Sequence, residues 1–206
     1  MTTTTQSDAH HNKERCPWCG DDTLYRAYHD EEWGVPCSDE HKLFEFLCLE
    51  SAQSGLAWIT ILRKREGYRK AFAKFNYKKV ALFSDTDVEQ LMNNPNIVRN
   101  KLKINAAINN AQRFMEVQKE FGSFANYLWH WVDNKPIQNR FKSLSEVPAT
   151  TDISNALSKD LKKRGFKFLG GTIMYAYMQS MGLVNDHITS CDSYSKAKTA
   201  GKNFIL

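Results

Sequence analysis

The sequence predicts an all-α protein with one main domain. Apolar residues recur at the three- and four-residue spacing of amphipathic helices, and no segment shows the sustained apolar–polar alternation of a half-buried strand. Serine, threonine and aspartate precede several of these stretches and glycine follows them, as is typical of helix ends. At 206 residues, 42% of them hydrophobic, the chain is long enough to bury a core without disulfides.

The first two predicted helices cover residues 38–53 and 57–75. Ser38 is a suitable N-cap for the first, and acidic residues follow it in the turn where the helix dipole favours them. The predicted core face of this helix consists of Leu43, Phe44, Leu47 and Cys48. A Ser-Gly break at 54–55 separates the two helices.

Three helices are predicted in the middle of the chain. A capping box at 84–87 opens a short helix that ends before Pro95. A long helix runs from Ile97 to a stop at Gly122, and Ser123 caps a further helix through Trp131. A polar connection follows at 133–148.

The last third of the domain predicts two helices, 151–164 and 172–181, joined by a glycine-bounded hairpin. Backbone amides ahead of the second helix can hold a phosphate. The basic residues around the hairpin are Lys159, Lys162, Lys163, Arg164 and Lys167. An ordinary helix pair with a solvated basic face and a DNA phosphate anchor both fit this pattern.

Both ends of the chain are predicted to lie outside the domain of residues 15–191. Residues 1–14 are polar and lack the apolar core of a signal peptide, so we expect a disordered tail and a cytoplasmic protein. Residues 192–206 are predicted to form a C-terminal tail. No apolar run approaches the roughly 20 residues of a membrane helix. The net charge of +5 permits nucleic-acid binding without establishing it.

The five cysteines are scattered and odd in number, which favours reduced thiols or a metal site over disulfides. A tetrahedral zinc shell can be formed by Cys16, His29, His187 and Cys191. His187 and Cys191 are four residues apart, so on one helical turn they share a face. Cys19 is a rival ligand in a C-x-x-C pair that also suggests redox chemistry. Unrelated thiols and histidines remain the third interpretation.

Aromatic residues are dense in the first sixty positions, namely Trp18, Tyr25, Tyr28, Trp33 and Trp58. Such residues usually belong to a core, and this applies most strongly to Trp33. Trp18, Tyr25 and Tyr28 precede the first strong helix and can instead line a cleft. Glu50 ends an otherwise apolar helix face, where it is either an exposed carboxylate or a buried functional acid.

Six motifs are long and specific. They are Glu-Arg-Cys at 14–16 with Trp18, Tyr-Arg-Ala-Tyr-His-Asp-Glu-Glu-Trp-Gly-Val-Pro at 25–36, Leu-Glu at 49–50, Gly-Leu-Ala-Trp-Ile-Thr at 55–60, Leu-Lys-Lys-Arg-Gly-Phe-Lys-Phe-Leu-Gly at 161–170, and Gly-Leu-Val-Asn-Asp-His at 182–187. Their content and order resemble the 3-methyladenine DNA glycosylase I family of the helix-hairpin-helix superfamily. The resemblance extends from about Glu14 to Cys191.

The resemblance implies a helix-hairpin-helix glycosylase fold, with the helix-hairpin-helix at about 151–182. It also implies one structural zinc per chain, held by Cys16, His29, His187 and Cys191 rather than by Cys19, which clasps the N- and C-terminal segments together. Four protein ligands leave no coordination position for water, so a structural role is expected.

The same resemblance assigns the other sites. It implies a base pocket formed by Trp18, Tyr25, Tyr28, Glu50 and Trp58. Gly55 and Leu56 match the loop that fills the gap left in the duplex, and the phosphate anchor is the hairpin with Gly165, Lys167 and Gly170. Glu50 is the predicted catalytic group, which recognises the base and stabilises positive charge as the glycosidic bond breaks.

The implied function is a monofunctional glycosylase, without lyase activity, that removes 3-methyladenine from DNA as the first step of base excision repair. The expected partner is double-stranded DNA containing alkylated bases, the product is free 3-methyladenine, and a monomer is sufficient. We expect no membrane partner, and association with the bacterial nucleoid through DNA.

Two positions depart from the related patterns. The superfamily usually has a catalytic Asp where this chain has Asn185, which looks like the pattern of this particular family. Ser51 replaces a common Gly and is expected to crowd the pocket entrance slightly. Two other functions remain, a non-catalytic DNA-binding module using the hairpin, and a thiol-redox protein using Cys16 and Cys19.

Overall fold

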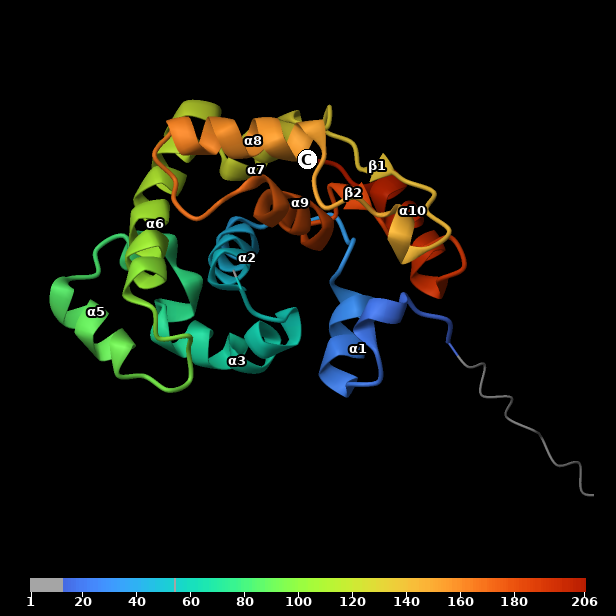
Figure 1. Ribbon diagram of the computed structural model, residues 1–206. Helices are drawn as coiled ribbons and strands as arrows, with labels where there is room; N and C mark the ends of the chain where they lie inside the picture. The colour runs from blue at the N-terminus through green and yellow to red at the C-terminus, as the bar shows by residue number, and fades with distance from the viewer. Residues whose placement is uncertain (1–12, 54) are drawn as a thin grey trace, which may run out of the picture.

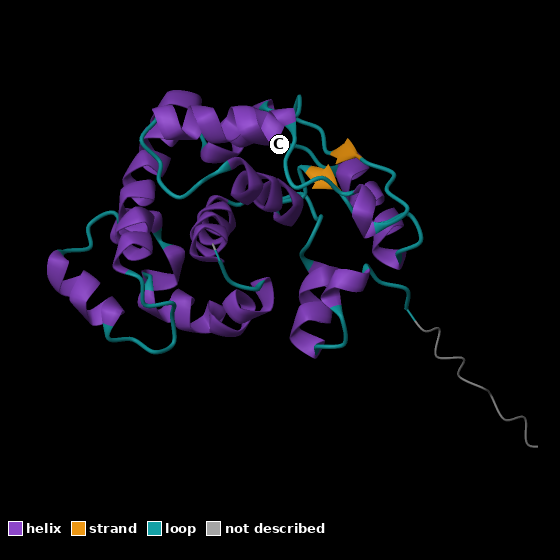
Figure 2. Ribbon diagram, in the orientation of Figure 1, coloured by secondary structure: helices purple, strands orange, loops and turns teal. Residues whose placement is uncertain are grey.

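The computed structural model describes residues 13–53 and 55–206, and it is almost entirely helical (Figures 1 and 2). The α-helices of these residues are α1 (Thr23–Glu31), α2 (Glu40–Gln53), α3 (Trp58–Ala71), α4 (Tyr77–Val80), α5 (Asp85–Met92), α6 (Lys101–Phe121), α7 (Phe124–His130), α8 (Asp152–Lys163), α9 (Gly171–Ser180) and α10 (Asp192–Asn203). Short 3-10 helices are η1 (Pro17–Cys19), η2 (Ala73–Phe75) and η3 (Leu144–Glu146). The predicted all-α class is therefore confirmed.

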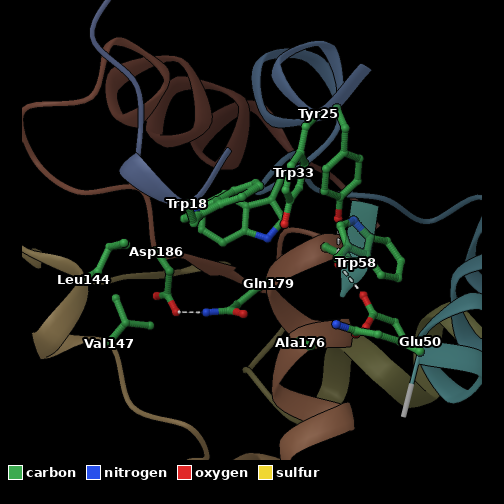
Figure 3. Close-up of a pocket in the computed structure, with 13 residues that line it drawn as sticks. Trp18, Tyr25, Trp33, Glu50, Trp58, Leu144, Val147, Ala176, Gln179 and Asp186 are labelled. Atoms are coloured by element: carbon green, nitrogen blue, oxygen red, sulfur yellow. Dashed lines mark hydrogen bonds between the residues drawn. The ribbon is translucent and has the colours of Figure 1, made fainter. Parts of the chain in front are cut away.

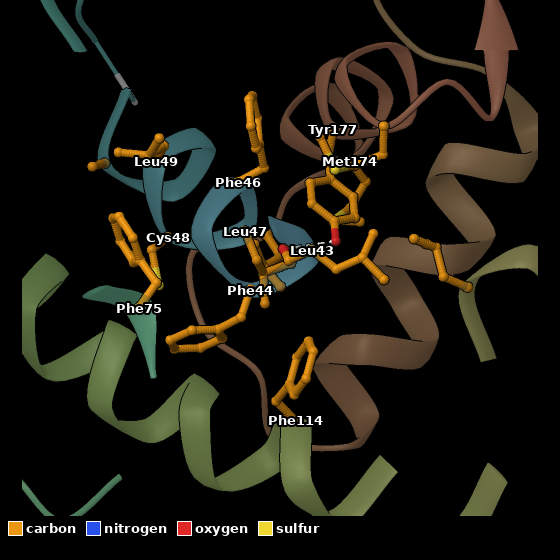
Figure 4. Packing of buried hydrophobic residues seen from close by; sticks show 14 of the residues in the cluster. Leu43, Phe44, Phe46, Leu47, Cys48, Leu49, Phe75, Phe114, Met174 and Tyr177 are labelled. Atoms are coloured by element: carbon orange, nitrogen blue, oxygen red, sulfur yellow. Dashed lines mark hydrogen bonds between the residues drawn. The ribbon is translucent and has the colours of Figure 1, made fainter. Parts of the chain in front are cut away.

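Helix α2 forms the centre of the molecule, and helices α3, α6, α7 and α9 pack around it (Figures 1 and 4). Its residues Leu43–Ala52 are all buried, so the predicted single apolar face is wrong. A helix that is apolar on every side belongs inside a core. Of its three buried polar residues, Glu45 is paired with Arg65 and Arg69 of α3. The helix also starts after Ser38, because the Asp39 carboxylate accepts the Lys42 N–H at 2.7 Å.

The predicted second helix is interrupted where the backbone turns left-handed. Ala73, Lys74 and Phe75 have φ values of 51°, 56° and 55°, which end α3 at Ala71 and produce η2. The turn lets Phe72 and Phe75 both enter the core, where their rings stack with centroids 6.3 Å apart. The short helix α4 that follows was not predicted.

Capping residues place the remaining boundaries close to their predicted positions. Ser84 and Asp87 form the predicted capping box of α5. Asn100 caps α6, which therefore begins four residues after the predicted Ile97, and Gly122 ends it with a φ of 83°. Helices α8 and α9 form the predicted helix-hairpin-helix, and Thr151 caps the first of them.

The described residues contain one small departure from an all-helical fold. Strands β1 (Ile137–Gln138) and β2 (Val184–Asn185) pair in parallel. Because β2 is extended, the chain is not helical where it reaches His187. The predicted shared helical turn of His187 and Cys191 is therefore wrong, although a turn still brings them together, with the Cys191 N–H bonded to the Ile188 carbonyl.

The two ends of the domain lie side by side (Figure 1). Residues 192–206, predicted as a tail, instead form α10 over Asp192–Asn203, with Ser193 and Ala197 buried. The Asp192 N–H donates to the Glu14 carbonyl at 3.0 Å, and Lys13 pairs with Asp30. The domain thus includes residues at both ends that we assigned to tails, while the prediction for residues 1–12 lies outside the described residues. Among the described helices, none has the length and apolar character needed to cross a bilayer.

Candidate active site

A pocket of about 190 Å³ opens between α1, α2, α3 and α9 (Figure 3). This aromatic pocket is lined by Trp18, Tyr25, Tyr28, Trp33, Glu50, Gln53, Trp58, Leu144, Val147, Ala176, Gln179, Ser180 and Asp186. Its volume equals that of roughly six waters, which suits one small ring system. The five residues predicted to form a base pocket, Trp18, Tyr25, Tyr28, Glu50 and Trp58, all lie in its wall.

The aromatic wall comes from three separate elements. Trp18 of η1 contacts Tyr25 and Trp33 with ring centroids 5.0 Å and 4.9 Å apart. Tyr28 of α1 contacts Trp58 of α3 at 5.6 Å. These tilted and edge-to-face arrangements keep each ring in place against its neighbours. Trp33, which we expected to be a core residue, is mostly buried and still contributes to the pocket wall.

Glu50 contributes a carboxyl group to the wall of this pocket, and only 2% of it is exposed. Tyr28 donates its hydroxyl proton to Ser180 at 2.9 Å, and Ser180 donates to Glu50 Oε1 at 2.7 Å. The other carboxylate oxygen, Oε2, is buried without a hydrogen-bond partner among the described residues, and so is the indole N–H of Trp58. Unsatisfied buried polar atoms are costly, so these two atoms suit a ligand that offers a donor to the carboxylate and an acceptor to the indole.

Burial raises the pKa of Glu50 from its usual range to about 8, and the hydrogen bond from Ser180 opposes this rise. Removal from water disfavours the charged carboxylate, whereas a donor to the carboxylate favours it. A cation in the pocket would favour the charged form in the same way. The group is therefore poised to change its charge state near neutral pH.

Three polar residues of the pocket were not predicted from the sequence, namely Gln179, Ser180 and Asp186. Gln179 and Ser180 lie three and four residues after Ala176, so α9 presents all three on one face, toward the pocket. Two adjacent polar residues at the end of a largely apolar helix were the available signal. Asp186 belongs to the motif at 182–187, but nothing in its spacing indicated that its side chain faces the pocket.

The two positions that departed from related patterns are placed away from the pocket. Ser51 is buried and donates to the Cys48 carbonyl at 2.9 Å, and it does not line the pocket. The expectation that it crowds the entrance is therefore wrong. Asn185 turns its amide toward Gln138 and the Tyr194 carbonyl, at 3.0 Å and 3.2 Å. The amide thus serves to connect β2 to its neighbours.

A second site joins the two ends of the domain. The ligand atoms of Cys16, His29, His187 and Cys191 all lie within 4.8 Å of one another and all four residues are buried. This Cys/His cluster can hold a metal ion. A hydrogen bond from Cys16 lowers the pKa of Cys191 in spite of its burial, so the cluster favours a thiolate. Cys19 donates to the Gly20 carbonyl and lies outside the cluster.

The surroundings of the cluster determine which nitrogen of each histidine can bind a metal. His29 Nδ1 lies 2.7 Å from a carboxylate oxygen of Asp30, and His187 Nε2 lies 3.1 Å from the Trp33 carbonyl. Both partners only accept, so these nitrogens carry the protons and the opposite nitrogens keep their lone pairs for the cluster. Gly34, with a φ of 76°, lets the backbone pass the His187 ring, which a Cβ would approach to 3.2 Å.

The predicted DNA anchor is the hairpin of residues 164–170 between α8 and α9. Asn110 of α6 holds Lys167 through two hydrogen bonds to its backbone, at 2.8 Å and 2.9 Å. The backbone N–H groups of 168–170 have no acceptor among the described residues. Lys159, Lys162, Lys163 and Lys167 are exposed. Arg164 was included in the basic set, but it is committed to ion pairs with Asp160 and Glu120.

The predicted gap-filling loop lies near the hairpin. Gly55 has a φ of 82°, and the half-exposed Leu56 lines a groove with Thr172 and Ile173 at the start of α9. Gln53 and Ala176 line both this groove and the aromatic pocket. The loop, the start of α9 and the pocket mouth thus share one continuous surface.

Comparison with known proteins agrees with this arrangement. A family model described as methyladenine glycosylase matches residues 18–194. DNA-3-methyladenine glycosylase 1 of Escherichia coli (strain K12) is 49% identical over 181 residues, which are 88% of this chain and 97% of that protein. DNA-3-methyladenine glycosylase of Haemophilus influenzae is 48% identical over 177 residues, 86% of this chain and 96% of that protein.

Solved structures show the same fold. A crystal structure of a 3-methyladenine DNA glycosylase I matches with a TM-score of 0.85 and 50% identity, over 87% of this chain and 98% of that one. The Staphylococcus aureus enzyme, solved to explain its recognition of 3-methyladenine, matches with a TM-score of 0.85 and 39% identity, over 87% of this chain and 96% of that one. The match in sequence and in structure extends over nearly the whole domain, and the chain belongs to the methyladenine glycosylase family.

Proposed function

We propose that this protein is a monofunctional DNA glycosylase that hydrolyses the N-glycosidic bond of 3-methyladenine in alkylated DNA. The observation that carries the proposal is Glu50, a buried carboxylate with one unpartnered oxygen in a pocket of electron-rich rings. The family relationship supports the reaction, because relatives are named as DNA-3-methyladenine glycosylases.

The pocket suits a base that carries positive charge. A purine methylated at N3 and still attached to deoxyribose is a cation, and aromatic faces favour a cation by roughly 0.5–2 kcal/mol per good contact. An ionised Glu50 adds a charge-assisted hydrogen bond. Neutral adenine lacks this charge, so it gains less from the rings and from the carboxylate and is disfavoured.

The reaction itself needs little assistance at the leaving group. The bond between N9 of the base and C1′ of the sugar breaks, and its electron pair neutralises the base. Water adds to C1′ and loses a proton. Glu50 recognises the base and stabilises positive charge as the bond breaks, because a fixed negative charge in a water-poor site acts strongly on developing charge.

The base must leave the duplex to enter the pocket, at a cost of a few kcal/mol. Leu56 occupies the position of a wedge at the pocket mouth, and the free backbone amides of the hairpin, next to Lys167, suit a phosphate. We therefore assign duplex DNA to the surface that carries both features.

The proposal is tested by incubating the purified protein with DNA methylated at N3 of adenine and identifying released bases by chromatography. We expect free 3-methyladenine and intact abasic sites, since no lyase step is involved. A protein that binds this DNA and releases no base would instead be a non-catalytic DNA-binding module.

Base release is expected to depend on pH through Glu50. Its pKa of about 8 lies above the ordinary value of 4.5, and the charged form is the one that favours a cation. The kcat/KM for base release should therefore rise with pH through about 8 and then level off, because this parameter reports ionisations of the free enzyme. A profile that falls across this range would contradict the assignment.

Ser180→Ala is expected to move this profile to higher pH. The substitution removes the donor that lowers the pKa of Glu50, so more of the carboxyl is protonated at neutral pH. Activity should fall at pH 7 and recover at higher pH. Ser51→Ala is the matched control, because Ser51 is buried next to Glu50 in sequence but bonds only to the Cys48 carbonyl. Its profile should coincide with that of the wild type.

Lys167→Ala is expected to weaken DNA binding equally for all DNA sequences. The slope of log affinity against log salt concentration is negative, and its magnitude should decrease by about 1. Its side chain is exposed while its backbone is held by Asn110, so the hairpin should keep its shape. Lys198→Ala is the control, since Lys198 is exposed on α10, far from the hairpin in Figure 1. Fluorescence-anisotropy titrations at several salt concentrations measure both slopes, and equal slopes would exclude a phosphate contact by Lys167.

We further propose that the Cys/His cluster binds one structural zinc ion. Zn–S bonds of about 2.3 Å and Zn–N bonds of about 2.0–2.1 Å at tetrahedral angles require S–N separations of about 3.5–3.6 Å. Three of the observed separations match, 3.6 Å from His187 Nδ1 to each sulfur and 3.5 Å from His29 Nε2 to Cys191 Sγ, and all four ligand atoms lie within 4.8 Å of one another. With four protein ligands, the role of the metal is to hold the two chain ends together.

A further inference from the structure

Gln179 places an amide in the aromatic pocket, and nothing assigned so far uses it. The residue lies near the end of α9, where its backbone carbonyl accepts the N–H groups of Gly34 and Gly182 at 3.0 Å and 3.2 Å. Its side-chain Nε2 donates to Asp186 Oδ2 at 2.8 Å. Figure 3 shows the amide in the pocket, with its nitrogen turned to Asp186 and its oxygen turned away from it.

Asp186 determines the orientation of that amide. Only 1% of it is exposed, and three donors converge on its carboxylate, namely Tyr175 and Asn139, each at 2.6 Å, and Gln179. A carboxylate surrounded in this way accepts hydrogen bonds, so Gln179 must turn its NH2 group toward it. The amide oxygen is then directed elsewhere, and it has no donor among the described residues.

The pocket therefore offers two acceptors. Glu50 Oε2 is buried without a partner among the described residues, and Gln179 Oε1 is the free end of an amide whose nitrogen is held by Asp186. A 3-methyladenine still attached to DNA carries N–H bonds only on its exocyclic amino group, because N3 is methylated, N9 holds the sugar, and N1 and N7 carry no hydrogen. That amino group has two hydrogens, which is one for each acceptor.

We propose that Gln179 is a specificity-determining residue that accepts a hydrogen bond from the exocyclic amino group of the bound base, and that Asp186 is the positioning residue that keeps the amide oxygen available. This inference rests on the proposed glycosylase function. The aromatic rings select a charged base, and Gln179 adds recognition of its amino group. A purine with an oxo group in place of the amino group would meet two acceptors and be disfavoured.

The test measures the binding of two ligands to two proteins. The proteins are the wild type and Gln179→Met, and the ligands are 3-methyladenine and 3-methylpurine, which lacks the amino group. Tryptophan fluorescence follows binding, since Trp18, Trp33 and Trp58 line the pocket. We expect Gln179→Met to weaken binding of 3-methyladenine about 2- to 10-fold and to leave 3-methylpurine binding unchanged. Equal losses for both ligands, or no loss for either, would overturn the inference.

Val147→Ala is the matched control, because Val147 lines the same pocket with an apolar side chain. Any loss of affinity it causes should be the same for both ligands.

Asp186→Asn tests the positioning role, since an amide at 186 can both donate and accept and no longer dictates the orientation of Gln179. We expect it to reduce the preference for 3-methyladenine over 3-methylpurine while the metal content stays that of the wild type. An unchanged preference would overturn the role of Asp186.

The experiments distinguish a wrong role for Gln179 from a wrong function for the protein. If the wild type releases 3-methyladenine from methylated DNA, and Gln179→Met changes the affinities for both ligands equally or not at all, only the assignment of Gln179 is wrong. If the wild type neither releases 3-methyladenine nor binds either ligand, the proposed function is wrong.

Discussion

Glu50→Gln is expected to reduce release of 3-methyladenine about 10- to 100-fold while the protein still folds. The substitution keeps the shape of the side chain and removes its negative charge. Among the described residues, Glu50 is the only acid with a buried carboxylate oxygen that has no hydrogen-bond donor. A hydrogen bond to a charged group is worth about 1.5–3 kcal/mol, and each 1.36 kcal/mol corresponds to tenfold in rate. Single-turnover kinetics on methylated DNA measures the loss.

The same substitution should increase stability at alkaline pH. The folded-state pKa of Glu50, about 8, lies above the unfolded value of 4.5, so the folded protein binds the proton more tightly. Its contribution to stability is present below pH 4.5 and is lost as the pH rises through 8. Gln at this position never ionises. Urea unfolding should therefore show Glu50→Gln and wild type alike at pH 4 and the variant more stable, by a few kcal/mol, at pH 9.

The control for both effects is Glu89→Gln, an exposed acid on α5 outside the pocket. It should change neither base release nor the pH dependence of stability. If Glu50→Gln released the methylated base at the wild-type rate and bound free base with unchanged affinity, Glu50 would have no part in recognition or catalysis.

Cys191→Ser is expected to lower the free energy of unfolding by more than about 3 kcal/mol and to lower the bound zinc well below one ion per chain. Loss of a structural metal is one of the few single changes with effects of this size, because binding energy at such a site contributes to folding. The cluster joins segments that are far apart in the chain, so its loss frees both ends of the domain. Metal analysis and urea unfolding, with and without a chelator, measure the effect.

Base affinity should fall together with the metal. Trp18 follows Cys16 by two residues, and the Trp33 carbonyl accepts from His187, so the cluster supports two rings of the pocket wall. Cys19→Ser is the control, because Cys19 is also buried but lies outside the cluster, and it should retain full metal content. A wild-type protein that is correctly folded with far less than one zinc per chain would contradict the structural role.

The predictions from sequence succeeded best where the signal is local. The capping box at Ser84, the cap at Ser123 and the stop at Gly122 depend on hydrogen bonds and dihedral angles within one turn, and each is found as expected. Boundaries failed where packing overrides local preference. The left-handed turn at 73–75 and the helix at 192–203 depend on contacts with distant residues, and their local sequence does not indicate them.

The residues of the site divide in the same way. The aromatic group, Glu50 and the four cluster residues could be selected from residue type, spacing and family resemblance. The folded chain was required to show that Ser180 carries a hydrogen bond to Glu50 and that Asp186 orients Gln179, because these contacts join α1, α2, α9 and the segment after β2. It was also required to show that Ser51 and Asn185 point away from the pocket.

The chemistry available to this protein is therefore encoded in its linear sequence, since helix periodicity, capping residues and ligand types are properties of short segments. The charge state and direction of each group are not. They depend on how far a side chain is removed from water and on which donor lies next to it, and residues as distant as Glu50 and Ser180 become neighbours only when α2 and α9 pack together.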